Sequence, residues 1–295
     1  IGWQRYLRDG QVLPAGVIEL LHEADAILCG SPPASGSEEP TPGLLERGIV
    51  FGLRREFGLA INVREFRSAD EALPRVVVVR ENSEGLYFSE GMTLHVRGDY
   101  ETSIEIASSS YSAVARTLRY GFERAHAEHV PLTVAHKTNV LVHSGKLWTR
   151  ALEDIAPEFP DVRIAVENID TCCGQLAAGS RRYGVIVSDN VFGDILSDVV
   201  CGVFRAVDHS CSVELSVGGG PSLFEPMHGP QGLSARVHRV SPFGTLSAVA
   251  ALAEHVGHAR VGRALGLATF ECLRTRPADA ALLDAISAAT ARRLQ

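Results

Sequence analysis

The sequence predicts an α/β fold with much parallel sheet, because short β-branched runs alternate with longer amphipathic stretches along the chain. Its 295 residues are 45% apolar, which is enough to bury the core of one large two-lobed unit or of two domains. The formal net charge of −7 argues against a nucleic-acid-binding protein, which needs a basic face.

The predicted elements follow in chain order. Buried strands are expected at residues 26–29, 75–80, 132–135, 162–166 and 184–187. Helices are expected at residues 14–22, 43–57, 109–128, 145–156, 192–204, 242–254 and 261–273. Residues 87–106 are polar and β-prone, so we expect a hairpin or arm there. Residues 31–42, rich in Ser, Pro, Gly and Glu, predict a flexible loop.

The ends and the cysteines indicate the compartment. No apolar stretch is long enough to span a bilayer, and no signal peptide begins at Ile1. No strand with a glycine-rich Rossmann turn opens the chain, so we expect residues to precede it. The six cysteines lie in apolar contexts without CxxC spacing, which is typical of buried free thiols. We therefore expect a soluble, cytoplasmic protein.

The most informative motif runs from Ser188 to Asp198, where a predicted strand leads directly into a helix. Asp194 is expected in the first turn of that helix, and Asp198 lies four residues later on the same face. Hard oxygen ligands at the carboxyl end of a strand suit Mg²⁺ or Mn²⁺. The alternative is a structural pair, with one aspartate favoured by the helix dipole and the other solvated. The spacing alone leaves both open.

Three arginines are candidates for carboxylate recognition. Arg54 closes a predicted helix, Arg64 ends the stretch Ala60-Ile-Asn-Val-Arg64, and Arg80 ends a predicted strand. The planar guanidinium of arginine matches a carboxylate with two hydrogen bonds at once. Each of the three can equally belong to a separate salt bridge, because the chain contains 26 arginines.

Lys137 stands out because Lys146 is the only other lysine in the chain. Lysine, unlike arginine, can act as a base when its environment lowers its pKa. Tyr87 and Lys137 both follow predicted strands, and such groups can serve as general acid and base when they are buried near charge. The glycines of residues 218–229 permit close approach of a ligand but lack GxGxxG or Walker spacing.

Together these motifs resemble those of the β-decarboxylating dehydrogenases, which include isocitrate, homoisocitrate, 3-isopropylmalate, tartrate and D-malate dehydrogenases. The matching stretches are Leu53-Arg54 to Asn62-Val-Arg64, Arg80-Glu-Asn-Ser-Glu-Gly-Leu-Tyr87, Ala135-His-Lys-Thr-Asn-Val-Leu141, Asp189-Asn-Val-Phe-Gly-Asp-Ile-Leu-Ser-Asp198 and Phe224-Glu-Pro-Met-His-Gly229. They follow in family order over nearly the whole chain.

The resemblance implies a doubly wound, two-domain sheet whose nucleotide site is not of the Rossmann type. A large cofactor-side domain is expected at residues 1–59 with 210–295. A smaller dimerisation and metal domain is expected at 60–209, with an arm near 88–106.

The resemblance also implies metal-dependent, NAD(P)-linked oxidative decarboxylation of a malate-type 2-hydroxy acid. It assigns roles to the residues that match the family motifs. By this resemblance, Arg54, Arg64 and Arg80 bind the substrate carboxylates. Asp194 and Asp198 hold Mg²⁺ or Mn²⁺ together with Asp170 of a neighbouring subunit. Lys137 of that neighbour removes the hydroxyl proton, and Tyr87 protonates the enol. Active sites shared in this way imply a homodimer with an isologous contact. Cofactor contacts are expected from Asn139, Asn190, Glu225, His228, Gly229, Leu233 and Ser241.

The substrate side chain is expected to contact the helix before Arg54. Isocitrate enzymes of the family place Ser and Asn there to hold a third carboxylate, and gapless counting gives Gly48 and Val50 here, followed by Phe51. An apolar wall leaves such a carboxylate unpaired, which is costly. We therefore predict an unsubstituted or 3-substituted malate, or a tartrate-like acid, and not isocitrate.

Several departures from the family leave alternatives open. At the position of Leu233, NAD-dependent members of the family carry Asp and NADP-dependent isocitrate enzymes carry Lys-Tyr. Family members usually have Asn just before the proline that opens the next helix, where this chain has Ser241. The choice between NAD and NADP therefore stays open. The alternatives for function are a non-catalytic regulatory paralogue, a dehydrogenase that does not release CO₂, and a plain binding module.

Overall fold

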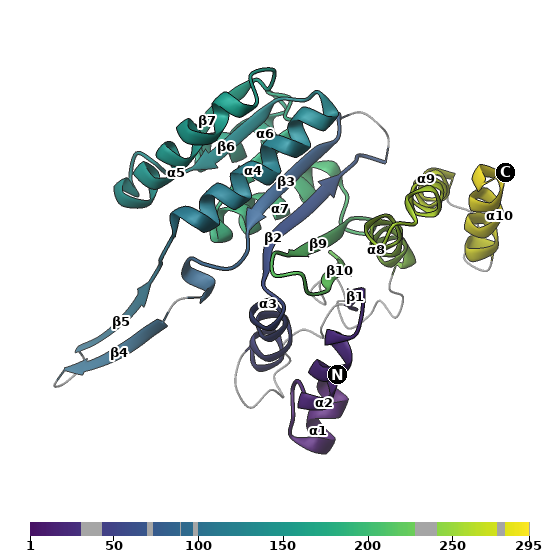
Figure 1. Cartoon of the computed structure of the whole chain (residues 1–295), viewed down its shortest axis with the longest axis horizontal. Coiled ribbons are helices and arrows are strands. Elements are labelled where there is room, and N and C mark those ends of the chain that lie inside the picture. The colour runs from purple at the N-terminus through teal and green to yellow at the C-terminus, as the bar shows by residue number, and fades with distance from the viewer. Residues whose placement is uncertain are drawn as a thin grey trace. The chain divides into compact units, whose positions relative to one another are not determined.

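A computed structural model describes residues 1–30, 43–69, 73–88, 90–96, 100–227, 241–275 and 281–294. The chain forms two compact units, which are unit 1 (residues 1–73 and 201–295) and unit 2 (residues 74–200) (Figure 1). Both units combine strands of one mostly parallel sheet or of antiparallel pairs with helices, so the predicted α/β fold is confirmed. The domain bounds expected from the sequence, 1–59 with 210–295 and 60–209, stay a prediction.

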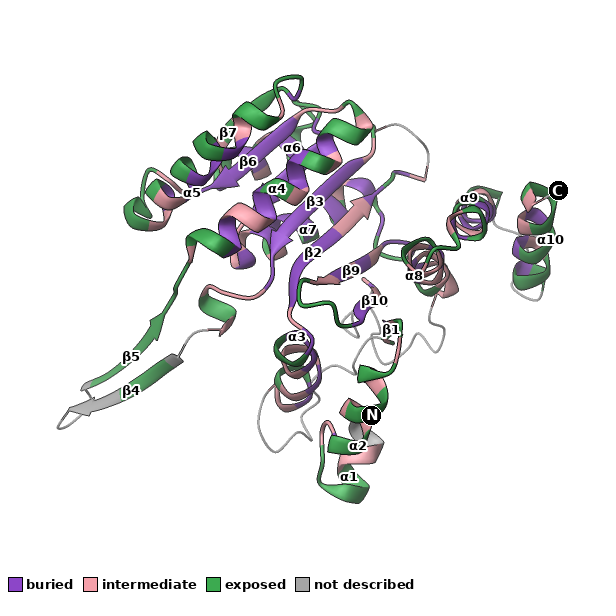
Figure 2. Cartoon of the chain, in the orientation of Figure 1, coloured by how far each residue is buried: buried purple, intermediate pink, exposed green. Residues whose placement is uncertain are grey.

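Unit 2 contains four parallel strands in the order β3 (Val76–Glu81), β8 (Val185–Ser188), β6 (Leu132–His136) and β7 (Ile164–Asn168). Figure 2 shows β3 and β6 buried along their length, whereas the edge strand β7 is partly exposed. Parallel strands that are covered on both faces have continuous apolar sequences. This is why the buried strands β3, β8 and β6 were predicted close to their observed bounds, whereas β7, expected at 162–166, is observed at Ile164–Asn168.

The helices of unit 2 follow its strands. They are α4 (Tyr111–Glu128), α5 (Val142–Ile155), α6 (Ile169–Ala178) and α7 (Asn190–Phe204), with 3₁₀ turns η2 (Leu86–Phe88) and η3 (Ala156–Glu158). Helix α6 was not expected. Helix α7 begins at Asn190 rather than near Phe192, so the prediction that Asp194 lies in its first turn is wrong; Asp194 lies in the second turn.

The arm predicted near residues 88–106 is an antiparallel hairpin. Strand β4 (Glu90–Val96) pairs with β5 (Tyr100–Ile106) from Glu90↔Ile106 to Val96↔Tyr100. Figure 1 shows this hairpin extending away from the sheet of unit 2. Its described side chains at residues 91–93 and 101–106 are exposed.

Unit 1 contains the strands β1 (Ala26–Leu28), β10 (Ser222–Pro226), β9 (Cys211–Ser216) and β2 (Leu59–Phe66), in that order. β1 is parallel to β10, and the other two pairings are antiparallel. Strands β2, β9 and β10 were not predicted from the sequence. In β9 the polar Ser212, Glu214 and Ser216 alternate with apolar residues, the period-2 pattern of a strand.

The helices of unit 1 are α1 (Trp3–Asp9), α2 (Ala15–His22), α3 (Gly52–Glu56), α8 (Pro242–His255), α9 (Ala259–Thr275) and α10 (Leu282–Leu294). The helix predicted at 43–57 is a π-helical turn, η1 (Glu46–Phe51), that continues into α3. α1 and α10 were not predicted. Leu45, Ile49 and Leu53 of this segment pack against Leu59 and Leu223 in a buried cluster that fixes α3 on the strands.

All six cysteines are free thiols, and Cys172, Cys201 and Cys272 are buried. Within the described ranges, no helix has the length and apolar character needed to cross a membrane.

Candidate active site

The carboxyl ends of the four strands of unit 2 carry most of the predicted catalytic residues. Arg80 lies level with Ser188, and Ser188 lies level with Ala135 on the next strand. His136 lies level with Asn168, which directly precedes α6. In parallel α/β sheets, ligands bind outside the carboxyl ends of the strands. This edge of the sheet is therefore the candidate site of unit 2.

Arg80, Tyr87 and Asp194 form one contact group at this edge. Arg80 is 1% exposed, and its Nη1 pairs with Oδ1 of Asp194. The Tyr87 hydroxyl donates to Oδ2 of Asp194 at 3.0 Å, and the Arg80 guanidinium carbon lies 5.4 Å from the Tyr87 ring centroid. A Cβ on Gly193 would approach Arg80 to 2.9 Å, so glycine lets α7 lie this close to β3. Two donors thus orient the Asp194 carboxylate.

Asn190 supports the same arginine. Its Oδ1 accepts from Nε of Arg80 at 3.0 Å and from Nη2 at 2.6 Å, and its amide donates to the Glu84 carbonyl at 2.7 Å. Asn190 is 1% exposed. The structure therefore places it as a support for Arg80, and its predicted cofactor contact stays a prediction.

Lys137 and Asp170, both predicted from the family motifs, are in contact. Nζ of Lys137 donates to Oδ1 of Asp170 at 2.6 Å. This ammonium holds the pKa of Asp170 below its usual range. The Asp170 side chain is 66% exposed, compared with 25% for Lys137. The pair therefore presents its carboxylate to the surface of unit 2.

His136 and Asp189 form a further pair at this edge that the sequence did not identify. His136 Nε2 lies 3.6 Å from Oδ2 of Asp189, and the His136 ring stacks on Trp148 with centroids 5.5 Å apart. Burial lowers the pKa of His136 to about 4 and raises that of Asp189 to about 6. Oδ1 of Asp189 accepts from the Phe192 N–H at 2.8 Å, at the start of α7. Asp189 stands three residues before the amide that it accepts from, which is the usual spacing of a helix N-cap. This spacing could have identified Asp189 from the sequence.

Arg54 in unit 1 is also buried against a carboxylate, which belongs to Glu214. Nε of Arg54 donates to both carboxylate oxygens of Glu214 at 3.0 Å, and Nη2 donates to Oε1 at 2.5 Å. The Arg54 and Glu214 side chains are 6% and 1% exposed. Sequence reasoning missed Glu214, although a charged residue within the alternating pattern of β9 was a possible signal.

The strand register places other predicted residues of unit 1 on the same face. Arg64 on β2 lies opposite Ser212 on β9, and Ser212 lies opposite Glu225 on β10. Residues directly opposite in antiparallel strands share a face, and two strand spacings are about 10 Å. Arg64 and Glu225 therefore lie about 10 Å apart on one face.

Val50 and Phe51, the predicted apolar wall, belong to the π-helical turn before Arg54, and their contact with a substrate stays a prediction. The Phe51 ring lies under the Arg54 guanidinium, with 5.2 Å from the guanidinium carbon to the ring centroid, and Val50 is half-buried. Gly48 packs on Val12 instead, because a Cβ at Gly48 would lie 2.5 Å from Val12 Cγ1.

The remaining cofactor predictions are scattered or lie outside the described residues. Asn139 is exposed in the turn after β6. The Ser241 hydroxyl donates to the Asp208 carbonyl at 3.0 Å, just before α8. His228, Gly229 and Leu233 lie outside the described residues. The cofactor contacts of all these residues stay a prediction.

Asp194 and Asp198, the predicted metal ligands, lie on successive turns of α7 and carry the hard oxygen donors that a divalent cation such as Mg²⁺ prefers. Asp194 is half-buried and already oriented, whereas Asp198 is exposed. Within the described part of a single chain, no three His, Cys, Asp or Glu side chains are grouped closely enough to hold a metal ion. The metal role of Asp194, Asp198 and Asp170 stays a prediction.

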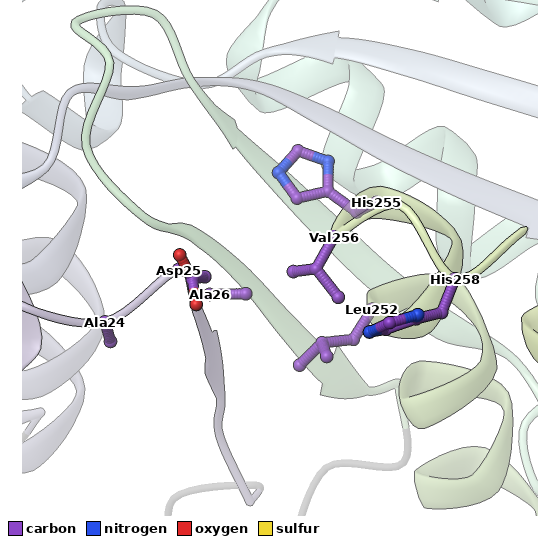
Figure 3. Close-up of a pocket in the computed structure, with 7 residues that line it drawn as sticks. All are labelled: Ala24, Asp25, Ala26, Leu252, His255, Val256 and His258. Atoms are coloured by element: carbon purple, nitrogen blue, oxygen red, sulfur yellow. The ribbon is translucent and has the colours of Figure 1, made fainter.

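A separate hollow of about 680 Å³ lies in unit 1 between the start of β1 and the end of α8. Figure 3 shows Asp25 on one side and His255 and His258 on the other. Because Ala26 pairs with Ser222, this hollow is level with the amino end of β10, away from Glu225. Among the residues that the structure describes, those that line this hollow include no predicted site residue.

Comparisons with known proteins agree with one another. The isocitrate/isopropylmalate dehydrogenase family profile matches residues 1–291. The 3-isopropylmalate dehydrogenase of Nocardia farcinica is 34% identical over 293 residues, which cover 96% of this chain and 87% of that protein. The 3-isopropylmalate dehydrogenase of Corynebacterium jeikeium is 38% identical over 267 residues, covering 87% and 78%.

Solved structures have the same fold. Isocitrate dehydrogenase from Methylococcus capsulatus has a TM-score of 0.83 at 24% identity, with 99% of this chain and 88% of that chain covered. A β-decarboxylating dehydrogenase from Thermococcus kodakarensis has a TM-score of 0.78 at 25% identity, covering 99% and 85%. The chain is therefore an enzyme of the isocitrate/isopropylmalate dehydrogenase family, a decarboxylating dehydrogenase.

Proposed function

We propose that the chain oxidises and decarboxylates a malate-type 2-hydroxy acid, with NAD or NADP as the acceptor. The observation that carries this proposal is the contact group of Arg80, Tyr87 and Asp194 at the carboxyl edge of the unit 2 sheet. It combines a cation for a substrate carboxylate, a carboxylate for a metal and a phenol for proton transfer.

Arg54, Arg64 and Arg80 are proposed to recognise the two carboxylates of the substrate. Arg80 is suited to this because Asn190 fixes its guanidinium through two N–H groups before any substrate arrives. Preorganised donors of this kind lower the entropic cost of binding.

Asp194 and Asp198 are proposed to hold Mg²⁺ or Mn²⁺, with Asp170 of a second copy of the chain as the further donor. The exposure of Asp170 fits such a role, since its carboxylate is reachable from outside its own unit. When bound, a divalent cation would supply Lewis-acid stabilisation of negative charge on the substrate oxygen, and NAD or NADP would supply the acceptor for the hydride that leaves C2.

Lys137 and Tyr87 are proposed to move the protons. Lys137 in its neutral amine form takes the proton of the C2 hydroxyl and becomes an ammonium, which Asp170, 2.6 Å away, stabilises. The bond from C3 to the leaving carboxylate then breaks and releases CO₂. Tyr87 gives its hydroxyl proton to C3 of the resulting enol, and the Arg80 cation beside its ring stabilises the phenolate.

These roles require a homodimer with shared active sites, because Lys137 and Asp170 would serve the site of the neighbouring copy. The substrate is proposed to be an unsubstituted or 3-substituted malate whose substituent carries no charge. Two observations support this, namely the apolar Val50 and Phe51 beside Arg54 and the 3-isopropylmalate dehydrogenases among the relatives.

A substrate scan tests the proposal. NADH and NADPH production is measured with Mn²⁺ and 3-isopropylmalate, D-malate, tartrate, homoisocitrate or isocitrate, and released CO₂ is measured in parallel. We expect turnover of a malate or tartrate with one CO₂ per reduced cofactor, and poor turnover of isocitrate. Asp194→Asn is expected to lose both Mn²⁺ binding and turnover, whereas the control Asp154→Asn, whose partner is the exposed Tyr111, retains both.

Three outcomes contradict the proposal. Efficient turnover of isocitrate contradicts the substrate class. Reduced cofactor without CO₂ contradicts the decarboxylation. Absence of turnover with intact Mn²⁺ binding favours a non-catalytic paralogue.

A further inference from the structure

The Arg54–Glu214 pair bears on the charge of the substrate. Glu214 accepts three hydrogen bonds from Arg54 between 2.5 and 3.0 Å, and both side chains are buried. An arginine buried without a counter-charge is strongly destabilising. Glu214 supplies that counter-charge from within the protein, so Arg54 does not need a substrate carboxylate to become neutralised.

Glu214 is held in place by its own neighbours. The Asn62 amide donates to Oε1 of Glu214 at 3.2 Å and to the Ser212 hydroxyl at 2.8 Å. Asn62 lies directly opposite Glu214 in the pairing of β2 with β9, and Arg64 lies directly opposite Ser212. All four side chains therefore share one face. The Glu214 carboxylate thus lies on the same face as Arg64, the second arginine assigned to the substrate.

Glu214 changes the charge of this face. Arg54 and Arg64 together contribute two positive charges, and Glu214 lowers the sum over these three residues to one. Because the environment is buried, a unit charge is weakly screened and affects the affinity of an anion several ångströms away. A substrate with one more carboxylate consequently gains less here than it would without Glu214.

We propose that Glu214 is a specificity-determining residue that favours substrates with two carboxylates over those with three. This rests on the proposed function, in which Arg54 and Arg64 face the substrate. It is independent of the apolar wall, since it acts through charge rather than through the shape of the pocket.

The test compares two ligands of similar size and different charge, 3-isopropylmalate and isocitrate, in calorimetric titrations with Mn²⁺. Glu214→Gln keeps the shape of the side chain and removes its charge. We expect isocitrate to bind about ten-fold more tightly relative to 3-isopropylmalate in this variant than in the wild type, as the ratio of the two dissociation constants shows. The control Glu271→Gln removes the same charge from an exposed contact with Arg293 in the same unit, and it leaves the ratio unchanged. An unchanged ratio in Glu214→Gln overturns the proposal.

A second variant covers the case in which Glu214→Gln does not fold. The double variant Arg54→Met/Glu214→Met removes both charges, a change that buried pairs often tolerate. Because the net charge stays the same, the ratio is expected to stay within about three-fold of the wild type. If the ratio changes ten-fold in favour of 3-isopropylmalate, binding of isocitrate depends directly on the charge of Arg54 and the proposal is overturned.

Binding and turnover separate this inference from the proposed function. If the wild type binds 3-isopropylmalate but produces no NAD(P)H, the proposed function fails while the ratio can still be measured. If neither acid binds to the wild type or to the variants, both proposals fail.

Discussion

Two arginines of this chain, Arg54 in unit 1 and Arg80 in unit 2, are both buried, and both pair with a carboxylate. They differ in the exposure of that carboxylate. Glu214, the partner of Arg54, is 1% exposed, whereas Asp194, the partner of Arg80, is 30% exposed. Asp194 can therefore still bind a ligand from solvent, whereas Glu214 can only act on the charge of its surroundings.

The difference has its origin in the local architecture. Arg80 ends a parallel strand, so its head group lies at the open carboxyl edge of the sheet. Arg54 belongs to a short helix that covers the antiparallel pair β2–β9, and Glu214 points to it from the middle of β9. An arginine–carboxylate pair thus leaves its carboxylate partly exposed in unit 2 and fully buried in unit 1.

The stability of the two pairs provides the largest expected difference. Arg54→Met leaves Glu214 charged and buried, and we expect the free energy of unfolding to fall by about 3–5 kcal/mol. Arg80→Met leaves the Asp194 carboxylate to water and should cost less, about 1–3 kcal/mol. Urea unfolding measures both, with Arg119→Met at the exposed contact with Glu158 as a control near zero. If Arg54→Met and Arg80→Met lower the free energy of unfolding equally, the different exposure of the two carboxylates does not affect stability.

Catalysis is expected to depend on the geometry of the open pair. Arg80→Lys keeps the charge but cannot reproduce the two N–H bonds to Asn190 together with the contact to Asp194. We expect kcat/KM to fall by about 10²–10³-fold, which corresponds to about 3–4 kcal/mol. Steady-state kinetics of Arg293→Lys, at an exposed pair with Glu271, should match the wild type. A similar kcat/KM for Arg80→Lys and the wild type would show that charge alone suffices.

His136 and Asp189 extend the comparison to a buried pair without arginine. Because the pKa of His136 falls to about 4 on folding, the unfolded chain takes up this proton first as the pH drops. His136 therefore makes the fold less stable as the pH falls from about 6.5 to 4, by up to about 3 kcal/mol. Asp189, with its pKa raised to about 6, opposes this loss, since the native state takes up its proton first.

His136→Phe retains the stacking on Trp148 and removes the titrating group. The difference between the unfolding free energies at pH 7 and pH 4 should shrink by about 3 kcal/mol relative to the wild type. Urea unfolding at the two pH values measures it, and the same pH dependence in both proteins would contradict the assignment to His136.

The smallest expected effect concerns the second donor to Asp194. Tyr87→Phe removes one hydrogen bond and the proposed proton donor, so kcat should fall by about 10²-fold, or about 2.7 kcal/mol. The thermal unfolding temperature should hardly change, because Tyr87 is 39% exposed. Tyr111→Phe, which loses an exposed hydrogen bond to Asp154, is the matched control and should keep full turnover. Wild-type kcat in Tyr87→Phe would exclude it as the proton donor.

The sequence allowed the fold of unit 2 to be predicted better than that of unit 1, for a physical reason. The buried parallel strands of unit 2 contain continuous apolar runs, such as the four valines that open Val76–Glu81. Strands β2 and β9 of unit 1 carry Asn62, Arg64 and Glu214 among their apolar residues, which hides them from a search for apolar runs.

The same contrast applies to the site. Asp194 and Asp198 lie within one short motif, and Lys137 lies within another. These local motifs were enough to select all three residues from the sequence. The contact of Arg54 with Glu214 joins residues 160 positions apart, and it depends on how β9 pairs with β2. No local pattern specifies such a contact.

The close approach of Gly48 to Val12 also restricts how this enzyme could change during evolution. A serine at position 48 would bring its Cβ to 2.5 Å from Val12 Cγ1, so that substitution alone meets a steric barrier. A smaller residue at position 12 would relieve the clash, but by itself it would leave a cavity beside the cluster of Leu45, Ile49 and Leu53. A residue larger than glycine at position 48 is thus separated from the present sequence by an order-dependent pair of mutations. The first of these mutations, at position 12, lowers the stability of the fold without a compensating gain.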